Sequence, residues 1–235
     1  TWDFVSGNAS VNEDHPHGLQ CFSTIAAYKP GSFVGTAPES KYFLLRTEDA
    51  PTEQMIEEYN WCLGAEYADS AGVDVISSSL GYTTFDNAAF NHIYADMNGN
   101  TTVISRMADM AAKKGILVVN AAGNDGQSSW HFIGAPADGD SVLSVGAVNS
   151  SGVIAGFSSF GPTSDGQVKP DAVSIGSGTI VSSTTGTIQS GSGTSFAAPN
   201  LAGLATCLWQ LFPEYNNYKI LTTIQKSGDR YTTPH

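Results

Sequence analysis

The sequence predicts an α/β fold with a mostly parallel central sheet and helices on both of its faces. Short apolar runs alternate along the chain with longer segments whose apolar residues recur at helical spacing. One of these runs, 116–119, is apolar at every position, which is typical of a parallel strand buried on both faces. Strands that alternate with helices form such sheets through right-handed crossovers. Because 235 residues suit one α/β unit, we expect a single domain over residues 1–235.

The first half of the chain supplies helices and strands in alternation. Residues 1–16 are polar and irregular, and they end in a turn before His17. A helical pattern that starts at Thr52 ends at Gly72, because glycine readily takes the left-handed conformation that closes a helix. In order, the predicted elements are a helix at about 17–28, a buried strand at 41–46, a helix at 52–71 and a strand at 73–77.

The second half begins with a segment that lacks regular periodicity. Residues 82–100 are polar and aromatic, so we expect a surface loop or an insertion there. After residue 141 the segments become short and are separated by Gly, Ser and Pro, which indicates one more central strand and then antiparallel ribbons. The predicted elements are a helix at 101–114, strands at 116–119 and 142–148, a helix that starts near Ser195 and runs to about 212, and a last helix near 216–227.

Composition excludes several classes of partner and cofactor. The chain has 22 acidic and 10 basic residues and a formal net charge of −12, which argues against binding to nucleic acid or to anionic membrane surfaces. No apolar run approaches the roughly 20 residues that a membrane-spanning helix needs. The three cysteines are too few and too scattered for a disulfide scaffold or a zinc site, and we expect no bound metal from them.

One stretch, Gly191 to Pro199, has the composition of a nucleophile at a helix N-terminus. Its glycines and small hydroxylated residues allow a tight turn, and helical spacing of apolar residues follows it. Ser195 is then expected beside backbone N–H groups that have no helical acceptor and that stabilise an oxyanion. Taken alone, the pattern fits an ordinary N-cap serine equally well.

Two further residues are candidates for the active site. In open parallel sheets, sites form at the carboxyl ends of the strands, where the connecting loops meet. A serine is a poor nucleophile unless a base takes its proton, and His17, at the start of the first predicted helix, is the best-placed base. Asn124 follows a buried strand on a glycine-flanked turn, where its side-chain amide can donate to an oxyanion. The alternative for Asn124 is a plain turn residue.

Together these segments resemble the subtilisin-like serine proteases (subtilases, peptidase family S8). His17-Gly18, Ser79-Leu80-Gly81, Ala121 to Asn124 and Gly193 to Pro199 occur in the order found in that family. The resemblance implies a three-layer fold and a serine endopeptidase that forms an acyl-enzyme. In that scheme Ser195 is the nucleophile, His17 the general base, and Asn124 part of the oxyanion hole together with the Ser195 N–H.

The resemblance also implies how a polypeptide substrate would bind. Six residues would line the cleft and pair with an extended peptide: Ser79, Leu80, Gly81, Ala121, Ala122 and Gly123. Gly134 resembles the glycine at the base of the main specificity pocket, and the absence of charge there predicts an apolar or aromatic residue before the cut. A cis peptide before Pro136 is also expected.

One member of the family's catalytic machinery is not found in this sequence. The family's triad aspartate lies on a strand some tens of residues before the histidine, and only Asp3 and Asp14 precede His17. We expect both to be solvated surface residues. The simplest interpretation is that residues 1–235 begin after the strand that bears the aspartate, so a propeptide or an N-terminal segment of the same protein is an expected partner. Alone, this chain should be nearly inactive.

The resemblance requires no cofactor and suggests an extracellular or cell-envelope location. The loop 28–33 lacks the Asn-rich ligands of the family's tight calcium site, while weaker sites around Asp138 and Asp140 stay open. Cys21, one helical turn after His17, is expected to be a small buried hydrophobe.

Three other functions fit parts of the same pattern. The first is an inactive subtilase-like module that binds peptides along the same cleft. The second is a sedolisin-type carboxyl peptidase, which uses a glutamate base and against which His17-Gly18 argues. The third, an α/β hydrolase, lacks support because no G-x-S-x-G elbow surrounds Ser195.

Overall fold

The computed structural model describes residues 1–12 and 15–232, and a parallel sheet lies at its centre. Four strands form this sheet in the order β5 (Val75–Ser78), β6 (Leu117–Ala121), β7 (Val142–Val148) and β8 (Ala172–Ile175). All of its neighbouring pairs are parallel. The predicted α/β class is therefore confirmed, and the prediction for 142–148 matches β7.

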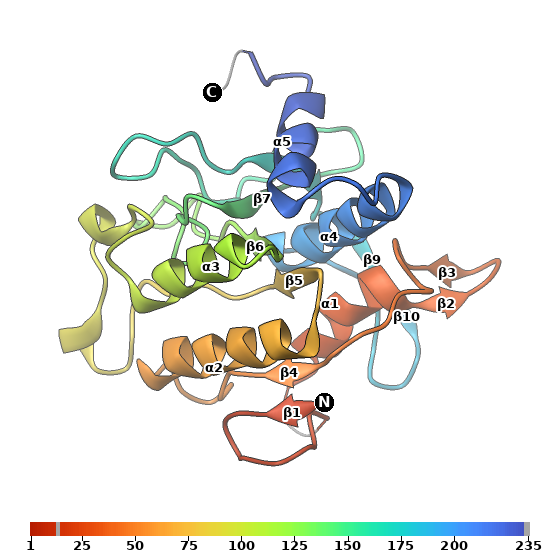
Figure 1. The fold of residues 1–235 in the computed structure, drawn as a ribbon, viewed down its shortest axis with the longest axis horizontal. Coiled ribbons are helices and arrows are strands. Elements are labelled where there is room, and N and C mark those ends of the chain that lie inside the picture. The colour runs from red at the N-terminus through yellow and green to blue at the C-terminus, as the bar shows by residue number, and fades with distance from the viewer. Residues whose placement is uncertain (13–14, 233–235) are drawn as a thin grey trace.

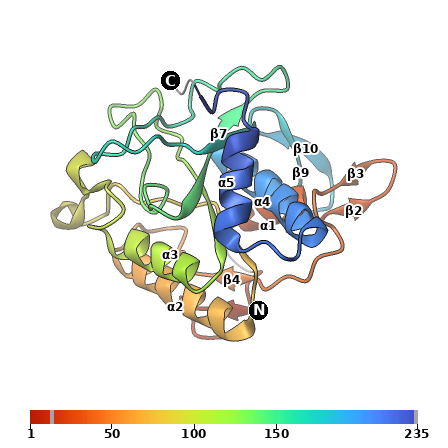
Figure 2. The same cartoon turned by 45° about the horizontal axis from the view of Figure 1, so that its top comes forward.

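Helices cover both faces of this sheet (Figures 1 and 2). On one side lie α2 (Ile56–Ala71) and α3 (Val103–Lys113), and on the other lie α1 (His17–Ala26), α4 (Thr194–Leu211) and α5 (Asn217–Ser227). The predicted helices are thus confirmed within a few residues at each end. No helix among the described residues combines the length and apolar character that crossing a bilayer requires.

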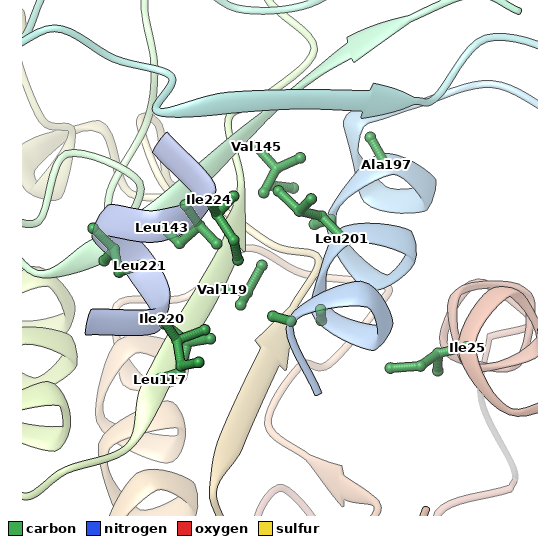
Figure 3. Packing of buried hydrophobic residues seen from close by; sticks show 14 of the residues in the cluster. Ile25, Leu117, Val119, Leu143, Val145, Ala197, Leu201, Ile220, Leu221 and Ile224 are labelled. Carbon is green, nitrogen blue, oxygen red and sulfur yellow. The ribbon is translucent and has the colours of Figure 1, made fainter. Parts of the chain in front are cut away.

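The alternation of side chains along β6 explains why its first three residues are all apolar. Leu117 and Val119 belong to the cluster that packs against α4 and α5, whereas Val118 belongs to the cluster under α2 and α3. Figure 3 shows the first cluster, in which Leu201 of α4 and Ile224 of α5 lie close to the side chains of β7. A strand covered on both faces must be apolar at consecutive positions.

Within the described residues, three two-stranded sheets flank the central one. β1 (Trp2–Asp3) pairs in parallel with β4 (Leu45–Arg46), β2 (Tyr28–Lys29) and β3 (Phe33–Val34) form a hairpin, and β9 (Thr179–Ser182) pairs antiparallel with β10 (Ile188–Gly191). The loop 82–100 contains only the short helices η1 (Ala88–Phe90) and η2 (Tyr94–Asp96).

Two strand predictions were wrong in detail. The predicted buried strand 41–46 shrinks to the half-buried pair Leu45–Arg46, because its partner among the described residues, β1, offers only two residues to the ladder. The segment after β7 was expected to form antiparallel ribbons alone. β8 instead joins the central sheet in parallel, and only β9 and β10 form the expected ribbon.

Asp3 was expected on the solvated surface, and this prediction was wrong. Its side chain is buried, with one oxygen accepting the N–H groups of Val5 and Ser6 and the other held 2.8 Å from Arg46 Nη1. Burial acts to raise the pKa of Asp3, but the hydrogen bond from Ser6 and the contact with Arg46 outweigh it and lower that pKa. Both carboxylate oxygens of Asp3 are therefore engaged in contacts within and next to the β1–β4 pair. Asp14 lies outside the described residues.

A group of carboxylates lies where the loop before α2 meets Tyr82. One carboxylate oxygen each of Glu48, Glu53 and Glu57 lie within 4.8 Å of one another. Both oxygens of Glu57 accept backbone N–H groups, which fixes the position of this side chain. Burial and the neighbouring Glu57 and Glu48 charges raise the pKa of Glu53 to about 7.

This raised pKa predicts a stability that depends on pH. Folded Glu53 keeps its proton up to about pH 7, whereas in the unfolded chain it releases the proton near its ordinary value of 4.5. The folded state therefore binds more protons in this window, and stability falls as pH rises through it. Glu53→Gln should raise the free energy of unfolding by about 1–2 kcal/mol at pH 8, allowing for solvent screening, and leave it unchanged at pH 4.

Urea unfolding at both pH values measures the effect. The exposed Glu66→Gln on α2 is the matched control and should shift neither curve. Equal gains for Glu53→Gln at pH 4 and pH 8 would contradict the assignment of the titration to Glu53.

Candidate active site

A cleft of about 270 Å³ opens at the carboxyl ends of β5 and β6. It is lined by every residue predicted to bind substrate, namely Ser79, Leu80 and Gly81 after β5, Ala121, Ala122 and Gly123 at the end of β6, and Gly134. Asn124 and Ser195 line it too. The expected cis peptide between Ala135 and Pro136 is present next to Gly134. Segments far apart in the sequence thus meet here, as expected where loops follow parallel strands.

Ser195 lies in the first turn of α4, as its sequence motif predicts. Gly193 precedes the helix, Thr194 is its first residue, and Ser195 is 9% exposed. The N–H of Ser195 belongs to the first turn, whose N–H groups have no acceptor within the helix. A negative charge placed at this end of α4 is also favoured by the helix dipole.

Pro199 lies inside α4. A proline has no N–H, so the carbonyl of Ser195, four residues earlier, lacks its helical donor. The Ser79 hydroxyl supplies that donor instead, at 2.8 Å from the Ser195 carbonyl oxygen. Pro199 and Ser79 therefore act together. The proline leaves the Ser195 carbonyl free, and the Ser79 hydroxyl ties the first turn of α4 to the loop after β5.

The orientation of the Asn124 amide follows from its contacts with Thr194. Its Oδ1 accepts the Thr194 N–H at 2.9 Å and the Thr194 hydroxyl at 3.1 Å. Only the oxygen of the amide can accept, so the Nδ2 donor is left for another partner. Gly123, with φ +112°, makes the turn before it, and a Cβ there would lie 2.7 Å from Ser159 Oγ. The geometry gives one exposed side-chain donor beside the Ser195 N–H.

His17 is the first residue of α1 and lies beside the start of α4. Its ring centre is 6.1 Å from that of Phe196, the residue after Ser195. Its Nε2 lies 3.6 Å from the Cys21 thiol, and among the described residues the imidazole forms no hydrogen bond with Ser195 or with a carboxylate. Burial and then the neighbouring His15 lower the pKa of His17, which favours the neutral form that a base requires.

The chain is similar in sequence to known proteins whose family agrees with this geometry. A profile described as "Subtilase family" matches residues 1–234. The chain belongs to the subtilase family. It is 33% identical to Subtilisin E of Bacillus subtilis (strain 168) over 229 residues, which cover 96% of this chain and 54% of that protein. It is also 33% identical to Subtilisin of Bacillus pumilus, covering 96% of this chain and 74% of that one.

Solved structures of subtilases share the fold. Sphericase superimposes with a TM-score of 0.75 at 25% identity, covering 95% of this chain and 74% of that one. A cold adapted subtilisin-like serine proteinase gives the same TM-score at 22% identity, covering 96% and 72%. The subtilase chain described here spans about half the length of several curated relatives, including Subtilisin E.

Three cleft residues of this subtilase were missed by the sequence analysis: Thr83, Asp125 and Thr194. Thr194 is fully buried and orients Asn124, a role visible only once the two segments meet. Asp125 brings a carboxylate to a cleft whose specificity pocket was predicted to be uncharged, and one of its oxygens accepts the Ser128 hydroxyl. Its position next to Asn124 in the sequence was the signal that could have placed Asp125 at the cleft.

Cys21 is buried, as predicted, in a small cluster with Val181 and Phe196. Burial raises the pKa of the Cys21 thiol to about 11, although a hydrogen bond with the Ser79 side chain acts in the opposite direction. The thiol therefore stays neutral beside His17 at physiological pH. It can pack behind the imidazole without competing for a proton.

The groups around Asp138 and Asp140 do not fit a calcium ion. Asp138 is fully buried, and its two oxygens accept the Ser105 hydroxyl and the Gly99 N–H. Asp140 Oδ1 accepts the Gln167 amide at 2.6 Å. Calcium needs six to eight oxygen ligands, and these carboxylates are already engaged by protein donors. The hairpin of β2 and β3, which was expected to lack the ligands of the family's tight calcium site, contains no carboxylate.

Proposed function

We propose that this chain is the catalytic part of a serine endopeptidase that cleaves polypeptides through an acyl-enzyme. The observation that carries the proposal is the pair of contacts from Thr194 to Asn124 Oδ1, which leaves Asn124 Nδ2 and the Ser195 N–H as donors at one cleft. Two donors beside a hydroxyl are the arrangement that acyl transfer needs. The similarity to subtilisins supports the same reaction class.

In the proposed reaction, Ser195 Oγ attacks the scissile carbonyl carbon and gives its proton to His17. The imidazole must turn from the Cys21 thiol toward Ser195 for this step. The oxyanion is held by the Ser195 N–H and Asn124 Nδ2. The C–N bond then breaks as His17 passes the proton to the leaving amine, and a water molecule activated by His17 releases the acyl group from Ser195.

The proposed substrate is an extended peptide that lies along the cleft. The backbones of residues 79–81 and 121–123 would pair with it, which lets one site accept many sequences. Gly134 leaves room for an apolar or aromatic side chain before the cut, and Asp125 is the one charged residue among the described lining. A peptide-library profile of the complete enzyme dominated by Lys or Arg before the cut would reject the apolar preference.

The triad carboxylate is proposed to come from outside residues 1–235, on a strand added between β4 and β5. The sheet edges support this: in the part of the chain that the structure describes, β4 has a neighbouring strand on one side only, and β5 is the edge of the central sheet. In Figure 1, β4 lies between β1 and β5. β5 also has an exposed and two half-buried residues, whereas β6 is wholly buried. A propeptide or N-terminal segment of the same protein, outside the cell or in its envelope, is the proposed source.

Labelling by a serine-directed organophosphate tests the peptidase proposal. In the full-length protein the reagent should attach to Ser195, seen by mass spectrometry of the peptide that contains it. Peptide binding without labelling would favour the inactive binding module, and activity confined to acid pH would favour the sedolisin-type reaction.

Removing the proposed oxyanion donor should lower kcat much more than it raises KM. In the full-length enzyme, Asn124→Leu should reduce kcat about 10²- to 10³-fold, because the lost hydrogen bond forms only as charge develops on the substrate oxygen. Steady-state kinetics on a peptide anilide measures this. The exposed Asn100→Leu in the loop 82–100 is the control and should behave as wild type. A KM effect with normal kcat would instead assign Asn124 to substrate binding.

A further inference from the structure

A row of polar side chains crosses the central sheet directly below the cleft. The ladder register pairs Ser78 of β5 with Asn120 of β6, and Asn120 with Ser144 of β7. Paired residues on neighbouring strands point to the same face, and Ser78 accepts the indole N–H of Trp61 from α2. The row therefore lies on the face covered by α2 and α3, among apolar side chains. Polar groups in such a place are costly unless each has a partner.

Asn120 uses its amide nitrogen to connect the two walls of the cleft. Nδ2 donates to the carbonyl of Leu80 at 3.0 Å and to the carbonyl of Ala121 at 2.8 Å. Leu80 belongs to one wall and Ala121 to the other, and both line the cleft. Both Nδ2 hydrogens are thereby used, so one buried side chain sets the separation of two backbone segments.

The other end of the Asn120 amide, its Oδ1, finds no hydrogen-bond partner among the described residues. Asn120 and Ser144 are both fully buried. Neither Asn120 Oδ1 nor Ser144 Oγ has a hydrogen-bond partner among the described residues. A buried polar atom without a partner costs about 1–3 kcal/mol. Asn120 and Ser144 are ladder partners on adjacent strands, and strands lie about 4.8 Å apart, a spacing that one buried water can bridge.

We propose that Asn120 is a positioning residue for the substrate cleft, held in orientation by one buried water shared between its Oδ1 and Ser144 Oγ. It touches no substrate and acts through the carbonyls of Leu80 and Ala121, whose segments would pair with the peptide backbone. This inference rests on the proposed peptidase function, since only an extended substrate makes the wall separation matter for activity.

The test compares Asn120→Ala with Asn60→Ala in the full-length protein. Asn60 is the matched control, because it is a buried asparagine of α2 whose Nδ2 donates to the Thr47 carbonyl, away from the cleft. Asn120→Ala should raise KM for a peptide anilide about tenfold with kcat changed less than about twofold, while Asn60→Ala leaves both unchanged. Asn120→Ser, which keeps one donor, should give a smaller KM change and covers the case in which alanine prevents folding.

Hydrogen exchange gives a second readout that needs no catalysis. Exchange in 79–83 and 121–124 should accelerate at least about tenfold in Asn120→Ala and not in Asn60→Ala. Ser144→Ala should change the same readouts in the same direction by about twofold to threefold, and a wild-type profile would overturn the shared water.

The outcomes separate this inference from the proposed function. Equal thermal destabilisation by the two alanine variants, with KM and exchange unchanged in both, would overturn the positioning role. If the wild-type protein cleaves no peptide yet Asn120→Ala still loosens 79–83 and 121–124, the peptidase proposal fails and the connection between the walls stands. If the wild-type protein cleaves no peptide and Asn120→Ala also leaves exchange unchanged, both the peptidase proposal and the positioning role fail.

Discussion

Replacement of Ser195 by alanine is expected to lower kcat for peptide hydrolysis by about 10⁶ in the full-length enzyme, the order found for the same change in subtilisin. The substitution deletes one oxygen at a site where the fold does not need it. The contacts that orient the neighbourhood, from Thr194 to Asn124 and from Ser79 to the Ser195 carbonyl, do not involve the hydroxyl. Binding of the peptide and the unfolding temperature should therefore stay close to wild type.

Single-turnover assays with a peptide anilide measure this loss. Ser192→Ala is a matched control three residues earlier, where the exposed hydroxyl accepts the N–H of Gly178. It should retain full activity. If Ser195→Ala kept more than about one hundredth of the wild-type rate, the nucleophile would have to be another group.

A double variant tests whether His17 serves the same step. Because nucleophile and base act as a unit, Ser195→Ala and His17→Ala together should be no slower than either change alone. Separate and multiplicative losses would mean that His17 contributes by another route, such as packing against Phe196.

The parts of this site that the sequence could predict are residues in short motifs that lie at the ends of predicted helices and strands. Ser195, Asn124 and the segments after β5 and β6 each lie at the end of an element whose periodicity marks its boundary, and a parallel sheet brings such ends together. The fold class was predictable for the same reason. What the local pattern could not give is pairing between distant segments: the Ser79 donor that compensates for Pro199 lies 116 residues from the carbonyl it serves.

Asp3 shows how the same limit produces an error. A single aspartate in a polar N-terminal stretch does not by itself predict burial. The N–H groups of Val5 and Ser6 satisfy one carboxylate oxygen, and the other is held by Arg46, 43 residues away. Asn120 is a similar case, because an asparagine at the end of an apolar strand is uninformative until the carbonyl of Leu80 is beside it. Such residues are found by asking where each buried polar atom finds its partner.

A protein that carries the aspartate-bearing strand as well as residues 1–235 is expected to hydrolyse peptides about 10⁴-fold faster than residues 1–235 alone. In subtilisin, loss of the aspartate costs about 3 × 10⁴ in kcat, because the carboxylate fixes the tautomer and orientation of the histidine and stabilises its protonated form. Here the His17 imidazole faces the Cys21 thiol, and no described carboxylate holds it toward Ser195. The strand should also pair with the open edges of β4 and β5 and raise the unfolding temperature.

Changing that aspartate to asparagine in the longer protein separates the two effects. A strand that only completes the sheet would give the gain in unfolding temperature and also the full rate, with or without the carboxylate. A catalytic carboxylate predicts that the asparagine variant keeps the thermal gain and loses the rate, since backbone pairing does not depend on the side-chain charge whereas orientation of His17 does. Turnover near 10 s⁻¹ by residues 1–235 alone would contradict the need for the carboxylate, because that is an ordinary rate for a complete enzyme. The His17 base would then have to be oriented by groups already within this chain.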